Sequence, residues 1–139
     1  MSDSFEDRHH REPNFTSWWC VFANVIQGED EGPNLASQGS SGTKHFLPGE
    51  TIAILDIYPN DNDRVIVLGR HRETHHYIEI VMRRKWLTNF RTELIEHPVV
   101  LGQLKKSERV VHSWRCHGVP SKENCDVLVE FFKSQQSNG

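Results

Sequence analysis

Short runs of β-branched and aromatic residues recur across residues 44–95 at intervals of about 8–13 residues, with turn-forming residues between them. This spacing is typical of the strands of a small β-barrel or sandwich. Within residues 77–82, the apolar side chains of Ile78, Ile80 and Met82 alternate with the others, which predicts a half-buried strand. With the apolar run that precedes this region, the expected strands are residues 17–26, 51–58, 64–70 and 77–82.

The segment 84–95 fits two structures. Trp86 and Phe90 lie at helical spacing, but from Phe90 onward apolar and polar residues also alternate as in a strand. We interpret the first part as a single helical turn and residues 90–96 as the last strand, because Pro98 would stop either element.

The order of these elements resembles that of the SH3-like barrels. A long loop follows the first strand, short turns join the next three, and a helical turn precedes the last one. The resemblance concerns topology and implies no particular function, since this small fold hosts many. We therefore expect a mainly β protein with a polar leader at 1–16, an SH3-like barrel at 17–97 and a C-terminal extension at 98–139.

A C-terminal helix is expected at residues 121–135. Ser121 can cap its first turn, and it carries one apolar stripe, made by Val127, Leu128, Phe131 and Phe132. This stripe would pack the helix on the barrel. Residues 110–115 (VVHSWR) are interpreted as a possible short strand.

Four sequence motifs point to a narrower resemblance. They are WWCVFANV at 18–25, GTKHFLPGETI at 42–52, VLGRHR at 67–72 and WLTNFR at 86–91. Together they resemble a family of uncharacterised bacterial proteins. The resemblance implies a small bacterial domain and brings no activity with it.

The net charge of −3 hides a division along the chain. Residues 1–63 hold eleven Asp and Glu against three Lys and Arg, a net of −8. Residues 64–91 hold seven basic residues against two acidic ones, and the remainder is balanced. Such polarity suits a protein partner with its own charge pattern better than non-specific binding to nucleic acid.

We expect a non-catalytic protein-binding module. A cytoplasmic immunity protein that neutralises a bacterial toxin is one protein of this kind, because such inhibitors need a stable scaffold and charge complementarity rather than chemistry. The alternative is a nucleic-acid-binding barrel that uses the basic and aromatic face of residues 64–91. A structural or adaptor subunit of a larger assembly is a third hypothesis. The sequence holds no nucleophile elbow, phosphate loop or HExxH motif, so we do not expect an enzyme.

In SH3-like folds the exposed groove lies between the first loop, the second loop and the helical turn. Here these are residues 27–42, 58–63 and 84–89. Aromatic residues and Arg dominate interfaces, so the expected partner-binding residues are Tyr58, Trp86, Arg70 and Arg72. The acidic residues Glu29, Asp30 and Glu31 are expected to steer the approach of the partner.

Metal and cofactor binding are not expected. The cysteines, Cys20, Cys116 and Cys125, form no CxxC pair, which favours reduced, mostly buried thiols over disulfides. His112, Cys116 and His117 have suitable ligand types but no paired motif, and His71 and His75 lack a third ligand. The first residues lack the basic start and apolar run of a secretory signal, so the cytoplasm is the expected location, without a membrane span.

Overall fold

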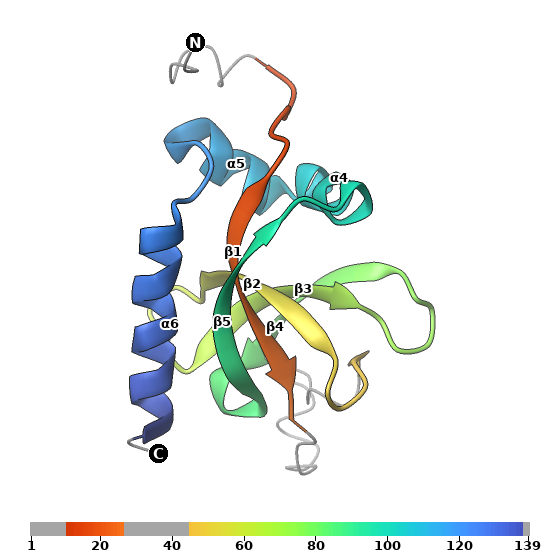
Figure 1. Cartoon of the computed structure of the whole chain (residues 1–139). Helices are drawn as coiled ribbons and strands as arrows, with labels where there is room; N and C mark the ends of the chain where they lie inside the picture. The colour runs from red at the N-terminus through yellow and green to blue at the C-terminus, as the bar shows by residue number, and fades with distance from the viewer. Residues whose placement is uncertain (1–10, 27–44, 138–139) are drawn as a thin grey trace.

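A five-stranded antiparallel sheet forms the centre of the molecule (Figure 1). The computed structural model describes residues 11–26 and 45–137. The strands follow one another in the order β4-β3-β2-β1-β5 across the sheet. Their bounds are β1 Trp18–Val25, β2 Thr51–Ile57, β3 Arg64–Arg70, β4 Tyr77–Arg83 and β5 Leu87–Ile95.

Both faces of the central strands are covered. In β3, Val65 and Val67 face one side and Ile66 and Leu68 the other, yet all four are buried. This two-sided burial explains why β1 and β3 are almost continuously apolar in sequence. Side chains on the two faces belong to two separate hydrophobic cores. We call the core that contains Val65 and Val67 the first core, and the core that contains Leu68 the second core.

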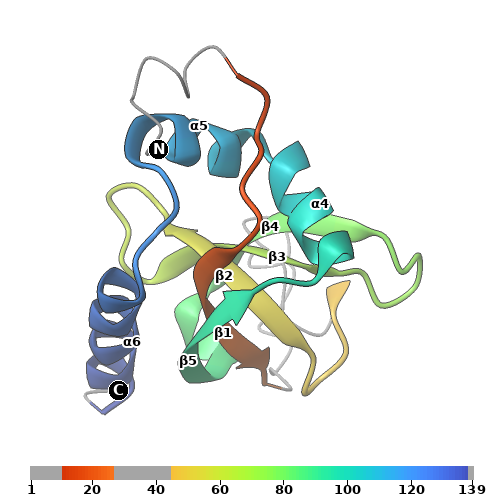
Figure 2. The same ribbon diagram turned by 45° about the horizontal axis from the view of Figure 1, so that its top comes forward.

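Three helices follow β5 and cover these two faces. They are α4 (Pro98–Lys106), α5 (Glu108–His117) and α6 (Lys122–Ser137). Helix α6 packs on β1 and β5 and closes the first core, whereas α4 and α5 close the second core. Figure 2 shows α4 and α5 together at one end of the molecule, away from α6. Among the helices within residues 11–26 and 45–137, none is long and apolar enough to cross a membrane.

The sheet is open, so the expectation of a closed barrel is not confirmed. Within the described part of the chain, β4 pairs with β3 and β5 pairs with β1, which leaves β4 and β5 as the two edges. The connection between them is one 3₁₀ turn, η1 (Arg84–Trp86). Among the described strands, no pairing between β4 and β5 closes the sheet.

The division of residues 84–95 into a turn and a strand is correct, but the strand begins earlier than expected. It starts at Leu87, and a bulge places two residues of β5, Asn89 and Phe90, opposite Ala23 of β1. Asn89 lies in this bulge with a φ of 56°. Leu87 and Phe90, three residues apart, consequently both face the first core, which is why the sequence also fits a helical period.

The expected strand at 110–115 is wrong, because these residues belong to helix α5. Val110 and Trp114, one helical turn apart, are buried in the second core. Ser107 caps the helix by accepting a hydrogen bond from the Val110 N–H (3.3 Å). The β-branched composition that indicated a strand is outweighed by this cap and by burial of the helical face.

Helix α4 was not expected, since Pro98 was interpreted as a stop. Proline is well suited to the first turn of a helix, where its missing N–H is not needed. Pro98 opens α4, and the His97 side chain accepts a hydrogen bond from the Val99 N–H at 3.2 Å. The same residue pair therefore ends β5 and begins a helix.

The C-terminal helix is confirmed, but only Phe131 and Phe132 of the expected stripe pack on the core. Cys125, Val129 and Phe132 are buried, whereas Val127 is 68% exposed and Leu128 37% exposed. Phe132 stacks on Phe90 of β5 with ring centroids 4.9 Å apart. Cys125, Val129 and Phe132, at helical spacings of four and three residues, form the contact with the core.

Candidate functional site

A cleft of about 1040 Å³ lies between the sheet and α5, and we call it the sheet–α5 cleft. Leu55, Ile66 and Val81 line it from β2, β3 and β4. Because α5 buries Val110 and Trp114, the adjoining flank of the helix faces the cleft. That flank contributes Arg109, His112, Ser113 and His117.

Two polar contacts fix the start of α5 against the sheet. The Ser107 hydroxyl donates to Glu79 Oε1 of β4 at 3.1 Å while it accepts the Val110 N–H, and Ser107 is only 6% exposed. Arg109 Nη1 forms an ion pair with Asp56 Oδ2 at 3.2 Å. These contacts hold the helix at the rim of the cleft, while its floor stays apolar.

Strand β4 presents an unpaired edge beside this cleft. At the hairpin the His71 N–H donates to the His76 carbonyl at 2.8 Å, which fixes the alternation of the β3–β4 ladder. By this alternation, the backbone groups of Ile78, Ile80 and Met82 point toward β3. Those pointing outward belong to Tyr77, Glu79, Val81 and Arg83, and no described residue pairs with them.

The β4 edge lacks most of the features that commonly block pairing with a further strand, and its charged residues are Glu79 and Arg83. Natural edges are protected by proline, by charged side chains and lysine above all, by bulges, by very short length or by a covering helix or loop. The seven residues of β4 include no proline and no lysine, and its pairing with β3 is regular. Ile78, Ile80 and Val81 are only half-buried. As far as residues 11–26 and 45–137 are concerned, the edge is therefore open to a further strand.

A second, smaller pocket lies at the start of β4. It has a volume of about 460 Å³ and separates the β3–β4 hairpin from α4, and we call it the hairpin–α4 pocket. Its lining residues are Arg70, His75, His76, Tyr77, Val99, Gln103 and Lys106. None of them is acidic. Lys106 also lines the sheet–α5 cleft, so the two sites adjoin.

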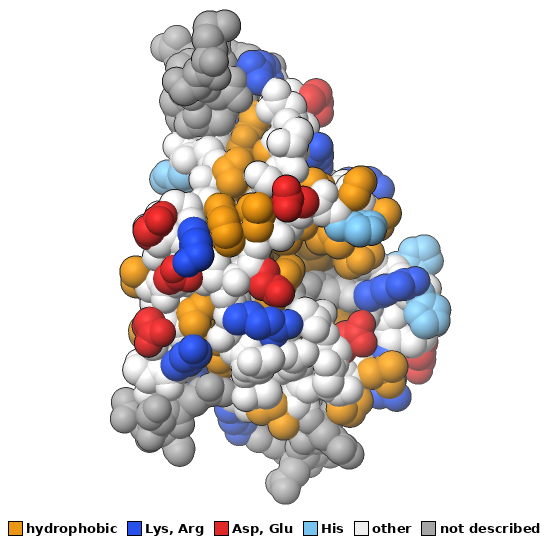
Figure 3. Space-filling model, in the orientation of Figure 1, with side chains coloured by type: hydrophobic (Ala, Val, Ile, Leu, Met, Phe, Trp, Pro, Cys, Tyr) orange, Lys and Arg blue, Asp and Glu red, His pale blue; other side chains and the backbone are white. Residues whose placement is uncertain are grey.

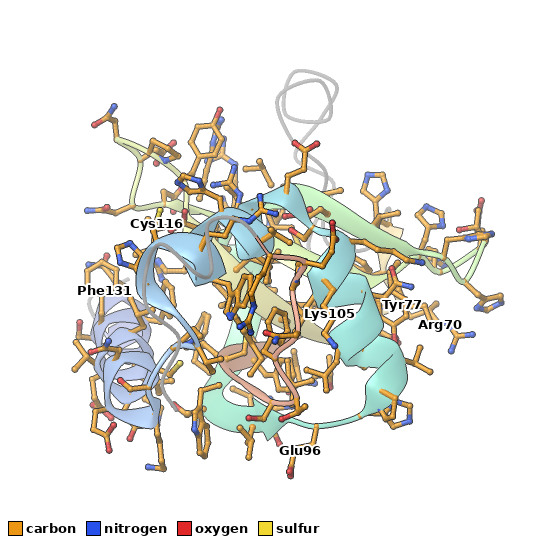
Figure 4. The ribbon with its side chains drawn as sticks, turned by 90° about the horizontal axis from the view of Figure 1, so that it is seen from above. Arg70, Tyr77, Glu96, Lys105, Cys116 and Phe131 are labelled. Carbon is orange, nitrogen blue, oxygen red and sulfur yellow. The ribbon has the colours of Figure 1, made fainter. Side chains whose placement is uncertain are left out.

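Backbone contacts order the hairpin around this pocket. Arg70 Nε donates to the His75 carbonyl at 2.9 Å, which holds the guanidinium at the base of the hairpin. His71 Nδ1 accepts the N–H groups of Glu73 and Thr74 at 3.1 and 3.3 Å. In Figure 3, basic and histidine side chains gather on the right, where Figure 1 shows the hairpin tip. Figure 4 shows Arg70 and Tyr77 beside α4.

The expected partner-binding residues differ in their exposure and location. Tyr58 is 38% exposed and lines the sheet–α5 cleft, and Arg70 lines the hairpin–α4 pocket. Arg72 is exposed in the hairpin, where its N–H donates to the His45 carbonyl. Trp86 is only 5% exposed, so its ring belongs to the first core and is not available to a partner. Glu29, Asp30 and Glu31 lie outside the described residues.

Ion pairs occupy the place of the expected groove between the second loop and the helical turn. Asp63 pairs with Arg83 at 3.1 Å and with Arg84 at 4.0 Å, and its carbonyl accepts the Arg84 N–H. Asp61 pairs with Arg64 at 3.3 Å. Arg91, in β5, pairs with Glu93 of the same strand at 3.5 Å. Carboxylates thus neutralise four of the seven basic residues of the segment 64–91.

The histidine and cysteine residues of α5 form a pair rather than a ligand set. Cys116 Sγ lies 3.7 Å from His112 Nε2, one helical turn away. In the part of the chain that the structure describes, no three His, Cys, Asp or Glu residues come together as metal ligands would. His117 instead lines the sheet–α5 cleft.

Sequence reasoning missed the helical flank that roofs the cleft. In a strand, the side chains of residues 110–115 would alternate between two faces. The interpretation as a strand therefore did not place them together on one flank. The signal that could have found it is Ser107 as a cap, followed by the apolar residues Val110 and Trp114 at helical spacing.

Comparison with protein-family models, with curated proteins and with solved structures gave no significant match. The resemblance to a bacterial family drawn from the four motifs therefore stays a prediction.

Proposed function

We propose that the protein is a non-catalytic binding module that takes up an extended segment of a partner protein along the edge of β4. The observation that carries this proposal is the unpaired edge itself, whose outward residues Glu79 and Val81 also line the sheet–α5 cleft. In strand addition, main-chain hydrogen bonds supply affinity and pockets for alternate side chains supply specificity. The cleft and the hairpin–α4 pocket supply two such pockets along one strand.

The charges around β4 favour an acidic segment. At the start of β4, Arg70 and Lys106 line the hairpin–α4 pocket, which has no acidic lining residue. At the other end of the strand, Arg83 and Arg84 are already paired with Asp63. An acidic residue at the end of the segment that reaches the pocket would therefore be complementary to it. The proposed occupant is therefore an extended, acidic segment of another protein.

Two narrower ideas belong to this proposal. The strand order and the 3₁₀ turn between β4 and β5 support an SH3-like topology, in an open rather than a closed form. A toxin-neutralising immunity protein would be one module of this kind, and a toxin gene adjacent to the coding sequence would support it. The nucleic-acid alternative is disfavoured by the ion pairs of Arg64, Arg83, Arg84 and Arg91.

Site-specific photo-crosslinking in the cells that make the protein tests the proposed face. A benzophenone amino acid is placed at position 81 on the β4 edge. The matched control places it at position 127, which is 68% exposed on α6. We expect one partner to be captured from position 81 and not from position 127. Capture from position 127 alone would move the interface to α6.

A peptide covering the captured segment then allows strand addition to be tested directly. Val81→Pro removes an outward N–H, and proline is tolerated on a strand edge whose N–H faces solvent. We expect this variant to bind the peptide about tenfold more weakly, since a backbone acceptor loses its donor. Val81→Ala keeps the N–H and should bind more tightly than Val81→Pro.

Circular dichroism and urea denaturation establish whether both variants fold. Equal affinities for the proline and alanine variants would exclude backbone pairing at β4. Sedimentation of the wild-type protein is expected to show a monomer. A dimer that Val81→Pro dissociates would identify a second copy of the chain as the occupant.

A further inference from the structure

The hairpin–α4 pocket differs in charge from the sheet–α5 cleft that it adjoins. The cleft contains both signs, with Asp56, Glu79 and Glu108 among its lining residues. In the hairpin–α4 pocket, the ionisable lining groups are two permanent cations, Arg70 and Lys106, and the side chains of His75, His76 and Tyr77. A concave site with positive charge and no carboxylate attracts anions.

The polar groups of this pocket are donors from two different elements. Arg70 uses its Nε for the His75 carbonyl, which leaves the two terminal nitrogens of the guanidinium for a ligand. Lys106 and Gln103 approach from the last turns of α4. Planar guanidinium and ammonium groups together suit an oxyanion that has several acceptor oxygens.

We propose that the hairpin–α4 pocket binds a phosphate group carried by the partner segment. The two fixed positive charges match a phosphate dianion, whereas a carboxylate carries one negative charge and two oxygens. The position of Tyr77 at the start of β4 places the pocket at one end of the edge where the segment would add. The carrier of the phosphate rests on the proposed function, but the pocket itself can be tested alone.

Titration of the full chain with inorganic phosphate, followed by the backbone amide shifts in two-dimensional NMR, is the direct test. Sodium chloride at equal ionic strength is the reference. We expect saturable shifts confined to the hairpin and α4, with a dissociation constant on the order of 1 mM, as for a small ligand held by a few polar contacts.

Three variants locate the site. Arg70→Gln and Lys106→Gln should each weaken phosphate binding by about tenfold, because each removes a charge-assisted contact. Lys105→Gln is the matched control, since its ammonium lies 5.4 Å from the ring centroid of Phe15 and does not line the pocket. All three positions are on the surface of the hairpin or α4, and urea denaturation checks that the variants are folded.

Distinct results overturn the proposal. Sodium chloride could produce the same amide shifts as phosphate, which would indicate non-specific charge attraction. The same conclusion would follow if Lys105→Gln lowered the affinity for phosphate as much as Lys106→Gln does. Acetate bound as tightly as phosphate would make the pocket a carboxylate site. Any of these results leaves strand addition at β4 intact, because crosslinking from position 81 is measured independently. Conversely, phosphate binding without a crosslinked partner would sustain the pocket and contradict the proposed function.

Discussion

Gly69 is the position in β3 at which a methyl group has no room. A Cβ atom there would lie 2.6 Å from Ile52 Cγ2 and 2.7 Å from Phe46 Cε1. Both neighbours are essentially fully buried in the first core. Because they are enclosed by other side chains, they cannot withdraw without moving the core, so the glycine is required by packing.

We expect Gly69→Ala to lower the free energy of unfolding by about 1–3 kcal/mol, as overpacked core substitutions do. Urea denaturation followed by circular dichroism measures this. Gly102→Ala is the control, since its added Cβ in α4 would meet nothing within 4 Å apart from its chain neighbours and the backbone of its own helix. That helical substitution should stabilise by up to about 1 kcal/mol. Equal stability of Gly69→Ala and the wild type would show that the core yields.

The stability of the protein at alkaline pH depends on the protonation of the Cys20 thiol. Burial, and to a lesser degree the nearby Cys125, raises the pKa of the Cys20 thiol from 9.0 to about 12. Its thiol donates to the Ile54 carbonyl at 3.3 Å. Between these two pH values the folded protein keeps a proton that the unfolded chain releases. The free energy of unfolding therefore falls as the pH rises through this window.

We expect the urea midpoint of the wild type to fall between pH 8 and pH 10.5, and to fall less in Cys20→Ala. The comparison with the variant removes the contribution of other groups that titrate in this range, such as lysine and tyrosine. Parallel pH profiles for the two proteins would show that Cys20 is not the titrating group.

At the scale of elements, α6 is held by Cys125, Val129 and Phe132, whereas its apolar residues Val127 and Leu128 are exposed. Phe132 is fully buried against Phe90, so Phe132→Ala should cost about 3–5 kcal/mol. Val127, on the exposed side of the same helix, should tolerate alanine within about 0.5 kcal/mol. Thermal and urea unfolding of the two variants measure the difference. Similar losses for both would mean that α6 packs through Val127.

The strands were more predictable from sequence than the helices. Apolar runs between turn residues predict β2 and β3 to within one or two residues, and the two-residue alternation of a half-buried strand predicts β4 equally well. The helices α4 and α5 depend on caps at His97 and Ser107, and their sequences are rich in valine. Local propensity for a strand is weak and was overridden by burial of Val110 and Trp114.

The candidate site was only partly predictable for a related reason. Tyr58 and Arg70 are in the two cavities, since residues of turns and strand ends are exposed whatever packs elsewhere. The burial of Trp86 and the pairing of Asp63 with Arg83 depend on how distant segments meet. The cleft itself exists because α5 packs across only part of the sheet, which no local pattern encodes.

At the scale of the whole molecule, one sheet separates two hydrophobic cores. Val21, Ala23 and Val25 of β1 face the core closed by α6, while Trp18 and Cys20 face the core closed by α4 and α5. Disturbing β1 therefore affects both cores. The open edge at β4 lies at the opposite end of the sheet from β5, so a segment could add there without contacting α6.

The pairing of β1 with β5 also sets an order of events during synthesis on the ribosome. Trp18 lies opposite Ile95, and β5 must have left the exit tunnel before this ladder can form. The first core waits longer still, for Cys125, Val129 and Phe132. Until then the apolar strand WWCVFANV has only β2 beside it, and long-range pairing of this kind is slow. The nascent chain thus carries an exposed hydrophobic strand of the sort that molecular chaperones bind.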